Sequence, residues 1–120
     1  MSQPSDGLAG AEGIVQQQLE EYNARDIDAF LALYSSEVVI TDLLDGSVMA
    51  RGLTEMRPMY QRLFTNNPDL HCQVVKRMVQ GDIVVDQEEV TGYADGYSMH
   101  AIAIYEVRDG LIRRLWVATQ

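Results

Sequence analysis

Residues 97–119 read YSMHAIAIYEVRDGLIRRLWVAT, two apolar segments over residues 97–107 and 111–119 that are joined by Asp109-Gly110. Valine, isoleucine, tyrosine and tryptophan favour strands, and an Asp-Gly step is a typical tight turn between antiparallel strands. Two similar segments precede them, over residues 70–79 and 83–91, and short glycine-containing turns separate them. Four consecutive strands with tight turns predict an antiparallel meander in the second half of the chain.

The first half of the chain shows helical periodicity. Between residues 11 and 24 the apolar side chains fall on one helical arc, with the polar Gln18 at its centre. Asp26 is a good N-cap for a second helix, whose apolar positions follow the spacing i, i+3, i+4, i+7. These positions are Ile27, Phe30, Leu31 and Tyr34.

A strand and a third helix are predicted before the meander. Residues 38–42, VVITD, indicate a strand, and residues 43–47, LLDGS, a turn. The third helix is predicted to begin at Thr54 as its cap, with Pro58 near its first turn, and to end at residues 66–68, Asn-Asn-Pro.

This order of elements predicts an α+β fold. We expect a cone, in which three helices from the N-terminal half pack on the concave face of a curved antiparallel sheet. Residues 11–120 would form this single domain, and residues 1–10, with two glycines and a proline, a flexible N-terminal tail. The other sheet face is also rich in valine, isoleucine and tryptophan, so we expect a homodimer through it.

The composition excludes several classes of partner. The 120 residues carry a net charge of −9, which disfavours nucleic acid and anionic membrane surfaces. No apolar segment approaches the about 18–20 residues that span a bilayer. A single cysteine and the absence of a signal-peptide pattern predict a cytoplasmic protein. The sequence lacks metal and nucleotide motifs, so no metal or cofactor is predicted.

Three groups of polar residues could carry chemistry. Asp42 shares a strand face with Ile40, so burial would raise its pKa towards that of a general base, although an aspartate here also suits a turn cap. Asp86 and Glu88 point the same way on one strand and could bind a metal or share a proton, although a solvated or dimer-lining strand is the more frequent cause. The two histidines, His71 and His100, belong to no metal motif, and proton transfer stays open for one that reaches the cavity.

Three motifs resemble the nuclear-transport-factor-2-like superfamily, which includes ketosteroid isomerase and SnoaL-like polyketide cyclases. They are NARDIDAF at residues 23–30, RGLTEMR at residues 51–57 and IYEVRDGLI at residues 104–112. The resemblance covers nearly all of the chain after Gly13. It implies the cone fold predicted above, and it does not specify a reaction.

The resemblance assigns roles to individual positions. Asp42 matches the general-base aspartate of ketosteroid isomerase, whereas Gln18 and Ala103 stand where that enzyme has its two oxyanion donors. Tyr34 and Tyr60 match supporting tyrosines. Because both strong donors are replaced, we expect a poor steroid isomerase. SnoaL-like cyclases use an aspartate acid/base, a role that Asp42, His71 or His100 could fill.

The sequence therefore supports two hypotheses. The first is a cofactor-independent enzyme of the isomerase, cyclase or hydratase type, which acts on a small hydrophobic molecule in the cone with Asp42 as base. The second is a non-catalytic module of the same fold that binds a small ligand or dimerises. In either case the residues expected to contact the ligand are Gln18, Tyr22, Tyr34, Met56, Met59, Tyr60, Ala103 and Leu115.

Overall fold

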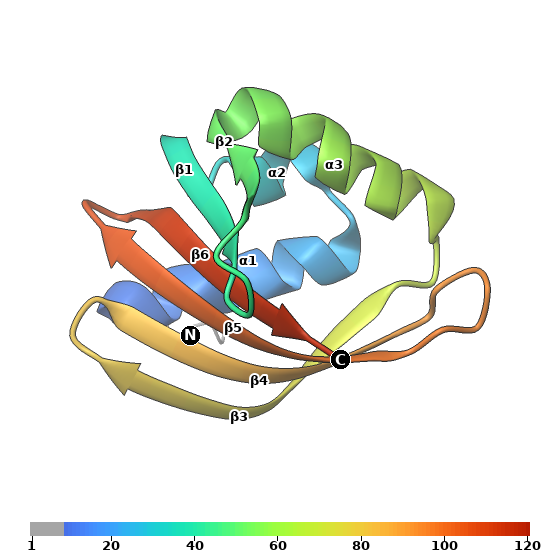
Figure 1. Ribbon diagram of the computed structural model, residues 1–120. Helices are drawn as coiled ribbons and strands as arrows, with labels where there is room; N and C mark the ends of the chain where they lie inside the picture. Colours follow the sequence, from blue (N-terminus) through green and yellow to red (C-terminus); the bar gives the residue numbers. More distant parts are fainter. Residues whose placement is uncertain (1–8) are drawn as a thin grey trace, which may run out of the picture.

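Six strands form one curved sheet in the order β2-β1-β6-β5-β4-β3 (Figure 1). The computed structural model describes residues 9–120, so residues 1–8 of the predicted tail lie outside the described residues. The strands are β1 (Tyr34–Asp42), β2 (Val48–Arg51), β3 (His71–Gln80), β4 (Ile83–Thr91), β5 (Met99–Arg108) and β6 (Leu111–Thr119).

Strands β3 to β6 form the predicted antiparallel meander. One pairing differs from the expectation, because β1 pairs with β6 in parallel. The sheet is therefore mixed. The reason is topological: β1 and β6 are joined through the whole of the intervening chain, so no tight turn imposes an antiparallel direction on them.

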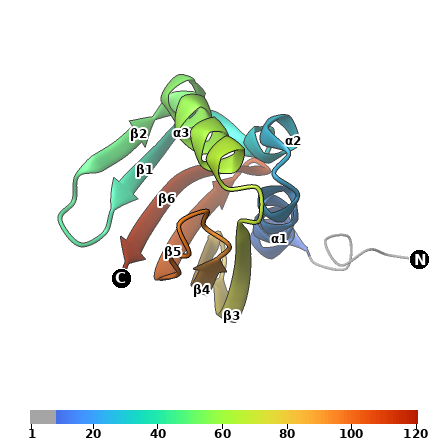
Figure 2. The same cartoon turned by 90° about the vertical axis from the view of Figure 1, so that its right-hand side faces the viewer.

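Three helices cover one face of the sheet, as the two views in Figures 1 and 2 show. They are α1 (Gly10–Ala24), α2 (Ile27–Leu31) and α3 (Gly52–Asn66). Helix α1 packs against β3 to β6, whereas α3 packs against β1 and β2. The predicted α+β cone is confirmed.

Local sequence explains where the helices begin. The Asp26 side chain accepts a hydrogen bond from the Ala29 amide at 3.1 Å, as expected for the cap of α2. That helix has only five residues, so Tyr34 lies in β1 and not on the helix. The predicted start of α3 at Thr54 was also wrong. The helix begins at Gly52, two residues earlier, and Gly52 itself adopts a φ of +71°, a left-handed conformation in which the chain turns from β2 into the helix.

The earlier start of α3 changes the position of Pro58. The proline lies in the second turn of the helix, where its missing N–H removes the hydrogen bond to the Thr54 carbonyl. At the helix start, Glu55 Oε1 accepts a hydrogen bond from the Arg51 amide at 2.7 Å. The N-cap residue is Arg51, not Thr54, and Glu55 reaches back to its amide as the acidic residue of a capping box does.

The core lies between the helices and the concave face of the sheet. Its largest fully buried side chains include Phe30, Ile40, Met56, Leu70 and Ile112. No helix within residues 9–120 is long and apolar enough to cross a membrane.

The outer face of the sheet also carries apolar side chains. Val85, Ile104 and Trp116 are aligned across β4, β5 and β6, and each is half-buried. The homodimer expected through this face stays a prediction.

Among the glycines of residues 9–120, Gly92 lies closest to a neighbouring segment of backbone. A Cβ at this residue would lie 1.9 Å from the Asp69 carbonyl oxygen, whereas one at Gly96 would meet nothing within 4 Å. Both glycines have a positive φ, of +83° and +84°. We expect Gly92→Ala to lower the free energy of unfolding by about 3 kcal/mol or more, and Gly96→Ala by about 1 kcal/mol. Urea unfolding of both variants measures the difference, and equal losses would contradict the close approach.

Candidate functional site

A cavity of about 400 Å³ lies between the helices and the sheet. This volume falls within the about 300–1,000 Å³ of small-molecule sites. The wall is mostly aromatic and aliphatic, with few polar groups. The lining residues are Gln18, Leu19, Tyr22, Phe30, Tyr34, Ile40, Met49, Met59, Tyr60, Leu63, Cys72, Glu88, Val90, Tyr93, Met99, Ala101, Ala103, Tyr105, Leu115, Val117 and Thr119.

Four polar groups of this wall form one buried chain of hydrogen bonds. The Tyr34 hydroxyl donates to Gln18 Oε1 at 2.9 Å, and Gln18 Nε2 donates to the Tyr105 hydroxyl at 3.2 Å. Tyr105 in turn donates to Glu88 Oε2 at 3.3 Å. The chain joins α1, β1, β5 and β4, and it ends on a carboxyl group that lines the cavity.

Glu88 is the acidic residue of the cavity wall. Its side chain is 9% exposed, and burial raises its pKa from an ordinary value of 4.5 to about 7. The negative charge of Asp86 raises the pKa further, whereas Tyr105, Cys72 and Arg77 lower it. A carboxyl group with this pKa is populated in both protonation states at neutral pH, so it can act as a proton acceptor or donor.

Asp86 lies two residues before Glu88 on the same face of β4 and is fully buried. Arg77 on β3 binds it with both ends of its guanidinium: Nε lies 2.7 Å from Oδ1 and Nη2 lies 3.0 Å from Oδ2. Arg77 Nη1 also donates to Gln16 Oε1 on α1 at 2.9 Å. The hydrogen bond to Asp86 raises the pKa of Arg77, which keeps the guanidinium charged.

A cluster of aromatic rings forms part of the cavity wall. Phe30 lies 4.9 Å from Tyr60, 5.1 Å from Tyr34 and 5.9 Å from Tyr22, measured between ring centroids. Burial raises the pKa of all three tyrosines, so their hydroxyls stay protonated. These hydroxyls can therefore donate hydrogen bonds at neutral pH.

The residues expected to contact a ligand lie in the cavity wall, with one exception. Gln18, Tyr34 and Tyr60 line the cavity, as do Tyr22, Met59, Ala103 and Leu115. The exception is Met56, which is fully buried among core residues and does not line the cavity. Its side chain is instead part of the hydrophobic core.

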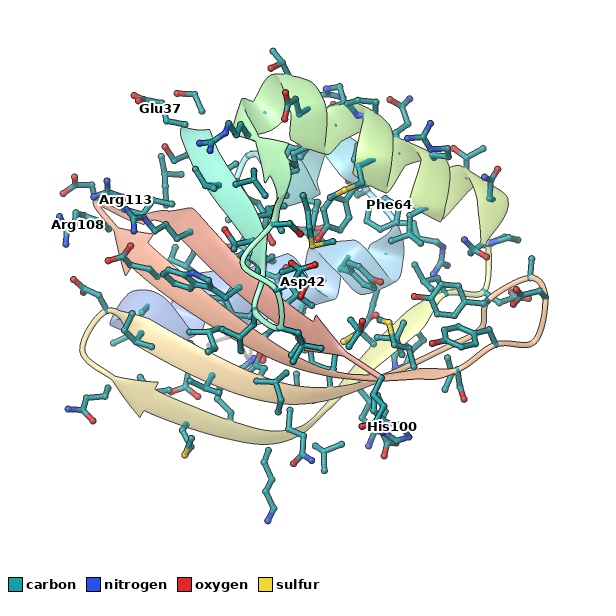
Figure 3. All side chains as sticks on the ribbon, viewed as in Figure 1. Glu37, Asp42, Phe64, His100, Arg108 and Arg113 are labelled. Atoms are coloured by element: carbon teal, nitrogen blue, oxygen red, sulfur yellow. The ribbon has the colours of Figure 1, made fainter. Side chains whose placement is uncertain are left out.

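Asp42 lies beside the cavity, outside the set of lining residues, where β1 enters the hairpin loop (Figure 3). Its register partner on β6, Val117, does line the cavity. Asp42 Oδ1 accepts a hydrogen bond from the Leu44 amide at 2.8 Å, and its backbone closes the turn with Ser47 and Gly46. This is the turn-capping arrangement that the sequence left open as the alternative.

Neither histidine lines the cavity. His71 is exposed at the start of β3. His100 projects from the sheet away from the helices, and its Nδ1 lies 3.9 Å from Glu89 on the same outer face (Figure 3). The alternation of side chains along β5 places His100 opposite to its neighbours Ala101 and Met99, which line the cavity.

Sequence reasoning missed the most polar part of the site. Tyr105 was not among the candidate residues. For the Asp86–Glu88 pair a metal site or a shared proton was considered, but a solvated or dimer-lining strand was favoured. The pair instead faces inwards. The available signal was its alternation with Val84 and Val90, because all four side chains share one strand face and both valines are fully or almost fully buried. Within residues 9–120 no group of three or more histidine, cysteine or acidic side chains could hold a metal ion.

The family is shown by the sequence itself. The model of the SnoaL-like domain matches residues 15–115, so the chain belongs to the SnoaL-like family. No curated protein matches the chain in sequence.

Solved structures share the fold at low sequence identity. An uncharacterised cystatin-fold protein from Novosphingobium aromaticivorans has a TM-score of 0.82 at 19% identity, covering 92% of this chain and 98% of that one. A candidate polyketide cyclase from Sinorhizobium meliloti has a TM-score of 0.76 at 19% identity, covering 96% and 99%. A candidate ketosteroid isomerase from Kribbella flavida has a TM-score of 0.79 at 17% identity, covering 92% and 77%. These likenesses establish the nuclear-transport-factor-2-like fold.

Removing the charge of Asp86 and removing the charge of Arg77 should move the pKa of Glu88 in opposite directions. Asp86→Asn removes a repelling charge and leaves Arg77, so we expect the pKa of Glu88 to fall. Arg77→Gln removes the cation, so the Asp86–Glu88 pair should hold a proton to higher pH than Glu88 does in the wild type. Carbon-13 NMR titration of the labelled carboxyl groups measures both shifts. Shifts in the same direction would argue against this electrostatic arrangement.

The raised pKa also predicts a dependence of stability on pH. Folded Glu88 binds its proton more tightly than the unfolded chain does, so its contribution to stability is present below pH 4.5 and is lost as the pH rises to about 7. The loss should be about 3 kcal/mol. We expect Glu88→Gln to lack this loss. The unfolding free energy of the variant minus that of the wild type should therefore increase as the pH rises over this range. A constant difference would mean that the group titrates normally.

Proposed function

We propose that the protein is a cofactor-independent enzyme that transfers a proton on a small hydrophobic molecule, an isomerase, cyclase or hydratase in reaction type. The observation that carries the proposal is the Glu88 carboxyl in the wall of an otherwise apolar cavity, at the end of the hydrogen-bond chain through Tyr105 and Gln18. Membership of the SnoaL-like family, and the fold shared with candidate cyclases and isomerases, agree with this reaction type.

Glu88 would be the group that moves the proton. In its ionised form it takes a proton from a carbon next to a carbonyl group, and in its protonated form it returns the proton elsewhere on the substrate. Its pKa of about 7 makes both forms available without a cofactor. The base and the acid can thus be one residue.

Gln18 would orient and polarise the substrate. One N–H of its amide donates to Tyr105, so the other can donate to a carbonyl oxygen. This neutral donor is weaker than the two groups found at the Gln18 and Ala103 positions of ketosteroid isomerase. We therefore keep the expectation that steroid isomerisation is slow.

Deuterium exchange into 2-tetralone tests the proposal, because this bicyclic ketone is small and apolar and enolises without a cofactor. We expect the wild-type protein to accelerate exchange of the α-protons, followed by proton NMR, above a buffer control. Glu88→Gln should lose at least about 100-fold of the acceleration, because general base catalysis typically contributes 10²–10⁴-fold. Glu89→Gln is the matched control, since it removes the same charge from the adjacent position on the outer face.

The same assay tests Asp42, which remains the base predicted by the resemblance. Loss of exchange in Asp42→Asn, with full exchange in Glu88→Gln, would assign the base to Asp42. Binding of 2-tetralone without any acceleration by the wild type would favour the alternative, a non-catalytic module that binds small ligands.

A further inference from the structure

The cavity wall has acidic but not basic character. Among the described residues, 9–120, no lysine, arginine or histidine lines the cavity, and Glu88 is the one lining carboxyl group. The other lining groups that can ionise are Cys72 and the tyrosines. Burial raises the pKa of Cys72, Tyr34, Tyr60 and Tyr105, so these groups stay neutral.

The titratable groups around Glu88 leave its charge uncompensated. Asp86 shares its strand face, Arg77 and Cys72 approach from β3, and Tyr105 from β5. Tyr34, Tyr22 and Tyr60 complete the surroundings from β1, α1 and α3. Arg77 is the one cation in this set, and two of its nitrogens are bound to Asp86. The guanidinium of Arg77 is therefore paired with Asp86, and this set contains no second cation that could pair with Glu88.

The rest of the wall suits a cation with an apolar body. Tyr22, Phe30, Tyr34 and Tyr60 present aromatic rings to the cavity. The faces of such rings attract organic cations, by about 0.5–2 kcal/mol each. The net charge of −9 also raises the local concentration of cations around the protein.

We propose that the cavity binds a hydrophobic amine, whose ammonium group pairs with the ionised carboxylate of Glu88 while its apolar body packs against the aromatic wall. The ligand supplies the cation that the protein does not. The proposal rests on the proposed function only in placing the ligand in this cavity, and it names the charge class of that ligand. A ligand carboxylate would instead be repelled by the negative charges of Glu88 and Asp86.

Three probes that share one ring system test the charge preference: 2-naphthylmethylammonium, 2-naphthylmethanol and 2-naphthoate. At pH 8, titration calorimetry of the wild-type protein should show the ammonium binding at least about 10-fold more tightly than the alcohol, with no binding of the carboxylate. Glu88→Gln should weaken the ammonium at least about 10-fold and change the alcohol less than about 3-fold. Glu89→Gln should leave all three unchanged, because its side chain lies on the outer face.

A second measurement needs no variant and so does not depend on how Glu88→Gln folds. Since only the ionised carboxylate attracts the ammonium, its affinity for the wild type should rise about 10-fold from pH 6 to pH 8, whereas that of the alcohol should stay constant.

Equal binding of the alcohol and the ammonium, no binding of the ammonium, or an ammonium affinity that does not change with pH would overturn the proposal. None of these results depends on exchange into 2-tetralone. Amine binding can therefore fail while the proton-transfer function stands, and the reverse also holds.

Discussion

The ion pair between Arg77 and Asp86 is the contact on which the polar interior depends. A fully buried carboxylate is costly unless it is paired, and here both oxygens accept from one guanidinium. Removing one partner of such a pair typically costs about 3–5 kcal/mol, because the other charge stays buried. The pair also reaches α1 through Gln16, so it connects the helix to the sheet at the same place. With Asp86 held in this way, Glu88 can occupy the next inward position of β4 as the acid of the cavity.

The second constraint is the hydrogen-bond chain from Tyr34 to Glu88. Gln18 joins two tyrosines from strands that do not neighbour each other, and its amide can do so only at one position of α1 relative to the sheet. A polar side chain in the middle of an apolar helix face thus specifies how the helix docks. Within residues 9–120 no fully buried side-chain nitrogen or oxygen lacks a hydrogen-bond partner. The polar groups of the cavity wall are therefore buried without the cost of an unmade hydrogen bond.

The sequence predicted most of the fold because the relevant signals are local. The turns at Gly81 and Asp109-Gly110 and the cap at Asp26 depend on neighbouring residues, and the structure has them where they were expected. The start of α3 was missed because its N-cap is Arg51, whose side chain makes no capping hydrogen bond, so the usual sequence signal for a helix start is absent there. The parallel β1–β6 pairing joins distant segments, which local patterns do not report.

The candidate site was harder to predict, because its main contacts join segments that are distant in the sequence. Helical periodicity placed Gln18 on the inward arc correctly, and it also placed Tyr22, Met59 and Tyr60 in the cavity wall, although Met56 lies in the core instead. Which face of β4 points inwards depends on register with β3 and β5, and a shift of one residue exchanges the faces. For this reason a solvated or dimer-lining strand was favoured for Glu88 over a metal site or a shared proton. Its partner Tyr105 is on another strand, 17 residues away, so no short motif could link them.

The parallel pairing of β1 with β6 has a consequence for the order of folding. Tyr34 and Ile40 on β1, and Leu115 and Val117 on β6, line the cavity side by side. During synthesis the cavity cannot close until β6 has been made and has docked against β1. Contacts between segments so distant in sequence form slowly, because a long loop must close first. The closed cavity should therefore form as one of the last events of folding, after the meander is complete.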